Sequence, residues 1–198
     1  MAMNEDAVLT AATGYIYTAP VGTAAPTPTD ITDFDPALGF TGWENIGHTS
    51  RDELPEFGFD GGDSEVKGTW QNASLREVVT EVASDYVVFN VHQFDDNALG
   101  LYYGADNASS TPGVFGVANA PTGTVNRAIL IVIVDGDVNL GFHAERVSIK
   151  RDDSIELASD EFAYMPLRAT FVKNTGAALL FSWISEDTGI GAEPVMAP

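Results

Sequence analysis

The stretch RAILIVIVDGDVNLGFHAERVSIK, residues 127–150, decides the fold class of this chain. Ile129–Val134 is an uninterrupted apolar run dominated by β-branched residues, which is typical of a buried strand. Asp-Gly follows at Asp135–Gly136, and Val138–Ile149 continues as a second extended segment. Two apolar runs joined by Asp-Gly are a strong local signal for a β-hairpin. We therefore expect a mainly β fold built around this hairpin.

The second strand of this hairpin changes the parity of its apolar residues. Leu140 and Phe142 share one parity, whereas Val147 and Ile149 share the other. Because successive side chains of a strand point to opposite faces, the change predicts a bulge near Gly141–His143. Such a bulge would let one strand serve two layers.

Other segments extend the β prediction along the chain. Strands are expected at Gly14–Thr18, at Met165–Lys173 with Pro166 near its start, and at Val114–Val117 within the connection 104–124. Ala178–Ile184 is either a last strand or a short helix, and residues 152–162 form a loop or one helical turn. Asp95–Tyr103 is predicted to be a short helix, capped by Asp95 or Asp96 and followed by Gly104, with an apolar side made of Leu99, Tyr102 and Tyr103.

Residues 74–92 carry conflicting signals. Ser74 followed by Glu77 is a capping-box pattern that favours a helix, whereas repeated valines favour strands. We favour two strands that meet near Ala83–Asp85, with the wetter face carrying Glu77 and Glu81. The sequence alone leaves open whether residues 74–84 are strand or helix.

An acidic segment precedes them. Leu54–Asp60 and Ser64–Trp70 flank Gly-Gly-Asp, which predicts an exposed hairpin whose glycines supply the positive φ of a tight turn. The stretches GFDGGDSE and VDGDV contain Ca²⁺-type ligands but lack the full EF-hand spacing, so turn chemistry explains them better.

The charge balance limits the function classes. The chain has 29 Asp and Glu against 9 Lys and Arg, a formal net charge of −20. Such a surface repels phosphates and anionic lipids, so tight nucleic-acid or membrane binding is not expected. With no cysteine there is no disulfide, Cys-zinc site or thiol catalysis. The three histidines lack metal-ligand spacing and no catalytic motif occurs, so we expect neither an enzyme nor a cofactor. The longest apolar run, Ala128–Val134, is too short to span a bilayer, which favours a soluble protein.

The N-terminal segment ATGYIYTAPVGTAAPTPTD, residues 12–30, lacks basic residues and carries its only acid at Asp30. No charged residue occurs from Ala7 to Thr29, and such a charge-free stretch suits a contact between acidic subunits, because like charges across a contact are costly. Tyr15 and Tyr17 would anchor the strand, and the prolines would keep the following arm extended. A flexible exposed leader is the alternative.

Several stretches together resemble the major tail tube proteins of long, non-contractile-tailed bacteriophages, particularly those infecting actinobacteria. The resemblance is carried by ATGYIYTAPVGTAAPTPTD, by GFTGWENIGHTSRDELPEFGFDGGDSEVKGTWQNASLREV, by SDYVVFNVHQFDDNALGLYYG and by the hairpin and strand from Ala128 to Lys173. It implies a β-sandwich or barrel with one flanking helix. It also implies hexameric rings that share an inner β-barrel, stack into a hollow tube and let viral DNA pass.

The resemblance also predicts the domain organisation of the chain and its partners. It implies one domain over residues 1–198, with an N-terminal arm at about 19–42, an exposed acidic loop or hairpin at about 44–70 and a C-terminal arm at about 186–198. Expected partners are further copies of the chain and tail-tip, tape-measure and tail-terminator proteins. The protein would be made in the host cytoplasm and end in the virion.

Candidate site residues follow from these expectations. The lumen-facing candidates are Glu77, Glu81, Glu65 and Glu145, since carboxylates repel passing DNA. The candidate contacts between subunits are Tyr15, Tyr17, Pro20, Pro26, Pro28, Arg51, Lys67, Arg76 and Arg127. Alternatives are a tail-terminator or head-decoration protein, or an acidic β-sandwich that binds carbohydrate or Ca²⁺.

Overall fold

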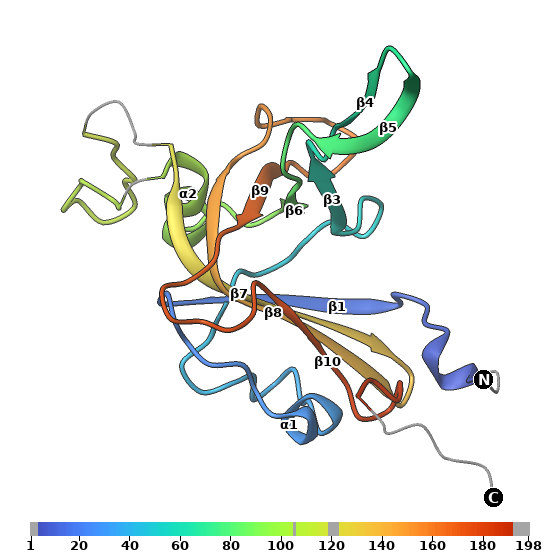
Figure 1. The fold of residues 1–198 in the computed structure, drawn as a ribbon. Coiled ribbons are helices and arrows are strands. Elements are labelled where there is room, and N and C mark those ends of the chain that lie inside the picture. Colours follow the sequence, from blue (N-terminus) through green and yellow to red (C-terminus); the bar gives the residue numbers. More distant parts are fainter. Residues whose placement is uncertain (1–3, 105, 119–122, 192–198) are drawn as a thin grey trace, which may run out of the picture.

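A computed structural model describes residues 4–104, 106–118 and 123–191 (Figure 1). The chain is mainly β, as predicted. The main sheet has eight strands in the order β2-β1-β7-β8-β9-β6-β3, with β10 paired to β8, and β4 and β5 form a separate two-stranded sheet. The elements are η1 (Glu5–Ala7), β1 (Thr13–Ala19), α1 (Pro28–Thr32), β2 (Glu44–Asn45), β3 (Glu56–Asp60), β4 (Ser64–Thr69), β5 (Asn72–Val79), β6 (Ser84–Val91), α2 (Asp96–Tyr103), β7 (Val125–Asp135), β8 (Val138–Arg151), β9 (Met165–Phe171) and β10 (Ser182–Ile184).

The hairpin of β7 and β8 forms as predicted, with Asp135 opposite Val138 and Gly136 at φ 63° in its turn. The bulge, however, is not at Gly141–His143. Those residues pair with β7 on one side and β10 on the other, so the strand has no room for an unpaired residue there. The register shifts farther along, where Arg127 pairs Val147 but Ile129 pairs Ala144.

The bulge lies where β10 gives way to β9 as the second neighbour of β8. The carbonyls of Glu145 and Arg146 leave the ladder and accept hydrogen bonds from the N–H groups of Gly22 and Val172. A bulged strand bends and twists more strongly. The first half of β8 therefore belongs to the part of the sheet around β1 and β10, and the second half to the part around β9 and β6.

The main sheet curls around a buried core. Residues 44–60 link its two ends, because β2 pairs with β1, Thr49 bridges Val91, and β3 pairs with β6. Burial of apolar surface inside this barrel is the main stabilising contribution to the fold. The core includes Ile16, Ile46, Val87, Phe89, Ile131, Phe142, Ile149 and Leu167.

A second, smaller core lies on the other face of the strands β1, β7 and β8. Ile31 of α1 is fully buried there against Leu130 and Val132, and Phe34 stacks on Phe40 with ring centroids 5.3 Å apart. The N-terminal arm thus folds back on its own sheet and is not the extended segment that its prolines predict. The change of chain direction begins locally, because the Thr27 side chain accepts a hydrogen bond from the Asp30 N–H and caps the start of α1.

The predicted hairpin between Leu54–Asp60 and Ser64–Trp70 is wrong in its pairing. Gly61 and Gly62 do have positive φ, 78° and 84°. They turn the chain from β3 into β4, but β3 pairs with β6 and β4 pairs with β5. The reason is tertiary: Phe57 of β3 packs on Phe142 and Trp183, which holds β3 against the barrel.

The segment 74–92 forms two strands, β5 and β6, as we favoured. Helix α2 is also confirmed, because the Asp95 carboxylate accepts from the Ala98 N–H at 2.9 Å and Gly104 ends the helix at φ 67°. Its buried side differs from the prediction: Ala98, Leu101 and Tyr102 are buried, whereas Leu99 and Tyr103 are only partly buried.

No strand forms at Val114–Val117, contrary to the prediction. The Asn107 side chain accepts from the Gly116 N–H and donates to the Val114 carbonyl, so these backbone groups are satisfied within the loop. Of the two alternatives for Ala178–Ile184, the structure has a strand, β10. Residues 152–162 form an irregular loop, in which Glu156 forms a β-bridge with Tyr164. Of the predicted C-terminal arm, residues 192–198 lie outside the described residues.

Candidate functional site

The hairpin of β4 and β5 projects from the barrel (Figure 1). Only Val78 is half-buried, and every other side chain of these two strands is exposed. Trp70, in the turn between the strands, is 99% exposed. An isolated two-stranded hairpin is marginally stable in water, and a fully exposed tryptophan is typical of a contact surface. The hairpin is therefore the clearest candidate for contact with another molecule.

The two faces of this hairpin differ in chemistry. Strand alternation places Val66, Leu75, Val79 and Glu77 on one face, because Val66 is opposite Glu77 in the ladder. We call this the apolar face. Val66, Leu75 and Val79 are 58%, 55% and 66% exposed.

The opposite face of the hairpin is charged. It carries Glu65, Lys67 and Arg76, with Lys67 directly opposite Arg76. The Lys67 ammonium lies 3.6 Å from the Glu65 carboxylate, and both side chains are exposed. Facing like charges are unfavourable in a ladder, and an exposed ion pair offsets little of that.

The hairpin and its base bring together three of the four lumen candidates. Glu65 and Glu77 lie on β4 and β5, and the Glu77 carboxylate accepts a hydrogen bond from the Ser64 hydroxyl. Glu81 follows β5, and its backbone N–H donates to the Asp63 carbonyl. Glu145 lies apart, in the bulge of β8, where its carboxylate accepts from the Asn174 amide at 2.9 Å.

The candidate contacts between subunits are dispersed. Tyr17 is only 2% exposed and packs within its own chain, as does the half-buried Tyr15. Pro20 and Pro28 are exposed, Pro26 is half-buried, Arg127 lies half-buried beside the bulge, Lys67 and Arg76 are on the hairpin, and Arg51 borders a groove.

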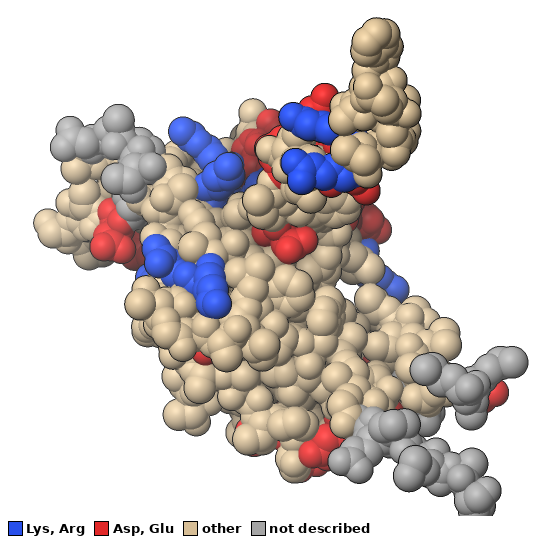
Figure 2. All heavy atoms as spheres, viewed as in Figure 1, with Lys and Arg blue, Asp and Glu red and all other residues tan. Residues whose placement is uncertain are grey.

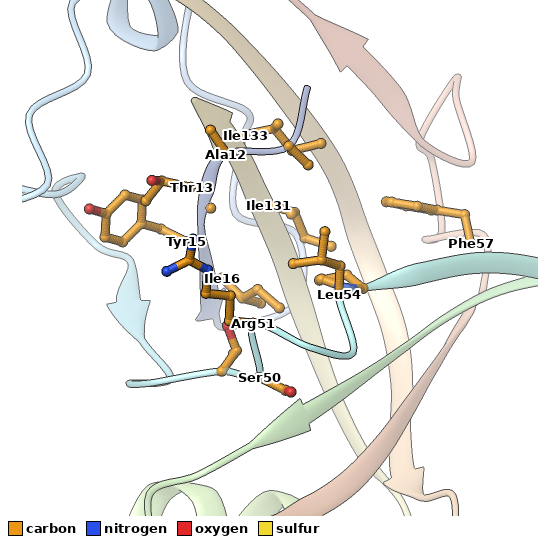
Figure 3. A pocket seen from close by; sticks show the side chains of 14 residues that line it. Ala12, Thr13, Tyr15, Ile16, Ser50, Arg51, Leu54, Phe57, Ile131 and Ile133 are labelled. Carbon is orange, nitrogen blue, oxygen red and sulfur yellow. The ribbon is translucent and has the colours of Figure 1, made fainter. Parts of the chain in front are cut away.

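That groove was not predicted. It has a volume of about 470 Å³ and lies between β1 and the segment that leads into β3 (Figure 3). Its apolar lining includes Ile131 and Ile133 of β7 together with Leu54 and Phe57, and Arg51 contributes the charged group. Its residues come from three distant parts of the sequence, so no local signal could identify it.

A cluster around Arg168 was also missed. Its guanidinium lies 2.6 Å from the Asp152 carboxylate, 2.9 Å from that of Asp60, and 4.0 Å from the centre of the Tyr86 ring. Contacts with these carboxylates and with this ring hold β3, β6 and β9 against the loop after β8.

Figure 2 shows Lys and Arg gathered in a few patches on the upper part of that view, with none on the lower part around α1 and β10.

Within residues 4–104, 106–118 and 123–191, no group of three His, Cys, Asp or Glu side chains is placed to hold a metal ion. None of the helices in these ranges is long and apolar enough to cross a membrane.

Comparison with known proteins supplies the family. Residues 1–197 match a family model described as phage tail tube protein. The chain is 56% identical over 192 residues to the major tail protein Gp23 of Mycobacterium phage D29, covering 94% of this chain and 95% of that protein. It is 54% identical, with the same coverage, to the major tail protein Gp23 of Mycobacterium phage L5.

The chain belongs to the phage tail tube protein family. The resemblance found in the sequence is thereby confirmed. This tail tube protein is a structural component of the phage tail and not an enzyme. Its exposed hairpin and groove are accordingly surfaces to be considered for assembly.

Proposed function

We propose that this protein forms hexameric rings that stack into a hollow tail tube, and that viral DNA passes through the tube during ejection. The observation that carries the proposal is the hairpin of β4 and β5, which exposes Val66, Trp70, Leu75 and Val79 on a strand pair outside the barrel. An apolar surface of this kind marks a contact between proteins. Membership of the tail tube family supports the same kind of assembly.

The acidic character fits a conduit for DNA. A wall rich in carboxylates repels phosphates, whereas a wall rich in lysine would gain affinity by counterion release and slow transit. We assign the wall to the candidates Glu65, Glu77, Glu81 and Glu145. Further partners in this proposal are tail-tip, tape-measure and tail-terminator proteins, and production takes place in the host cytoplasm.

Contacts between subunits are proposed for the exposed and half-buried candidates of the arm, the hairpin and the groove. Pro20, Pro26 and Pro28 offer an uncharged surface on a chain of net charge −20. Arg51, Lys67, Arg76 and Arg127 offer scarce positive charge for acidic neighbours. Tyr15 and Tyr17 support these contacts from within, since they hold the arm on β1.

Electron microscopy of concentrated purified protein tests the assembly directly. We expect hollow tubes with six-fold end views. Protein that stays monomeric at high concentration, even with a tail-tip initiator, would contradict the proposal. Closed caps without extended tubes would indicate a tail-terminator or head-decoration role instead.

The wall assignment has its own test. Glu65→Lys combined with Glu81→Lys should leave tubes intact but slow DNA ejection, because each change reverses a charge that repels phosphate. Glu161→Lys, on the exposed loop after β8, is the matched control and should leave ejection unchanged. The measurement is the rate of DNA ejection from virions that carry the wild-type protein, the double variant or the control. Equal rates in all three would reject the assignment.

A further inference from the structure

The groove beside β1 has an apolar lining in which Ile131 is buried and Ile133 is half-buried. Ile131 and Ile133 project into it from β7, and Leu54 and Phe57 approach from the other side (Figure 3). Leu54 is 49% exposed and Phe57 is 36% exposed. Apolar side chains exposed around a concave surface favour binding of another apolar surface.

The same groove runs along a free strand edge. β1 pairs with β7 from Thr13 to Ala19, but on its other side β2 pairs only with Tyr17 and Thr18. Within the described residues, the backbone of Thr13–Tyr15 has no strand partner on that side, and these residues line the groove. A free edge beside an apolar groove is suited to an incoming strand.

The chain itself carries a strand pair that matches the groove. The apolar face of the hairpin exposes Val66, Leu75 and Val79 and bears one charge, the Glu77 carboxylate. The groove has one charged lining residue, Arg51, which takes part in no ion pair among the residues the structure describes. Both surfaces are therefore mainly apolar, and their single charges have opposite signs.

We infer that the apolar face of the hairpin of one copy docks on the groove beside β1 of a second copy, with Glu77 against Arg51. The inference rests on the proposed self-assembly and names the surfaces that perform it. Each copy offers one hairpin and one groove, so the contact is heterologous and can repeat from copy to copy. This inference moves Glu77 from the proposed lumen wall into the contact with a neighbouring copy, so the wall then consists of Glu65, Glu81 and Glu145.

Cross-linking tests this adjacency because the chain has no cysteine of its own. We expect the double variant Val66→Cys and Leu54→Cys to form, under mild oxidation of assembled protein, a covalent ladder longer than dimers. Each single variant should reach dimers at most, since one thiol can join only two chains. The matched control, Lys67→Cys with Leu54→Cys, places the thiol on the charged face of the hairpin and should give no ladder.

Charge exchange provides an independent measurement. Arg51→Glu and Glu77→Arg should each raise the protein concentration needed for tube formation about tenfold, because each places like charges in the contact. The two changes together should restore it. Arg51→Glu combined with Glu65→Arg is the control and should not restore assembly, since Glu65 is on the other face. Thermal melting of each variant checks that the subunit itself folds.

The outcomes separate this inference from the proposed function. Wild-type protein that forms no tubes would contradict the proposed function itself. Tubes that form from the Val66→Cys and Leu54→Cys variant without a covalent ladder, or a charge exchange that fails to restore assembly, would overturn the inference alone. Either result would show that the hairpin of a second copy does not occupy the groove.

Discussion

His143 connects the N-terminal arm to strand β8. It is 5% exposed, its Nε2 donates to the Thr23 carbonyl at 3.0 Å, and its ring meets that of Trp43 edge-on at 5.6 Å. Burial lowers the pKa of His143 below the ordinary 6.5, and the Thr23 carbonyl and Glu145 partly oppose this effect. The neutral ring is therefore the form that holds the arm.

This pKa shift predicts a pH dependence of stability. Above pH 6.5 the ring is neutral in both the folded and unfolded states. As the pH falls below that value the unfolded state takes up the proton first, so the free energy of unfolding decreases until the folded pKa is passed. Each unit of depression corresponds to about 1.4 kcal/mol.

Melting temperatures between about pH 8 and pH 5 measure this effect. His143→Gln should show a smaller decrease over that range than the wild type, because it cannot be protonated and keeps an N–H donor for Thr23. His92→Gln, at the position that follows β6, serves as the matched control. Identical pH profiles for His143→Gln and the wild type would contradict the assignment.

Among the elements, α2 depends on its cap. Asp95 satisfies the N–H of Ala98 at the start of the helix, and Asp95→Ala removes that acceptor. We expect a decrease of about 1 kcal/mol in the free energy of unfolding. Chemical denaturation measures it, with Asp106→Ala in the exposed loop after α2 as the control. An equal loss in both variants would show that removal of charge, and not of the cap, is responsible.

Local signals predicted the elements that depend on local chemistry. The Asp-Gly turn of β7 and β8 and the cap and glycine of α2 are contacts within a few residues, so the sequence displays them. Thr27 and Asp30 form a capping box that starts α1, with Pro28 in its first turn, and this is a local signal of the same kind.

Pairing partners were harder to predict because they depend on which strand edges are already occupied. The bulge lies at Glu145–Arg146 since β10 occupies β8 before it, and β4 pairs with β5 because β6 holds β3. The same limit applies to the candidate site. The hairpin residues Glu65, Glu77 and Lys67 could be named from the sequence, whereas the groove needs side chains from β1, β7 and the segment before β3.

At the scale of the whole molecule, like charge opposes assembly. Subunits of net charge −20 repel one another, and every Lys and Arg lies between Arg51 and Lys173, which leaves both terminal segments without positive charge. Salt screens this repulsion, with a Debye length of about 10 Å at 0.1 M and about 3 Å at 1 M. Salt also screens the proposed pair of Glu77 and Arg51, but the apolar contacts of the hairpin docking do not weaken with salt.

We therefore expect tube formation to accelerate as NaCl rises from about 0.05 M to about 0.5 M. Light scattering during assembly, followed by microscopy of the products, measures the rate. The variant Asp33→Asn with Glu44→Gln, at exposed positions of the acidic N-terminal part, should assemble faster at low salt and respond less to added salt. Assembly that slows as salt rises would show instead that attraction between opposite charges, and not apolar contact, drives the association of this tail tube protein.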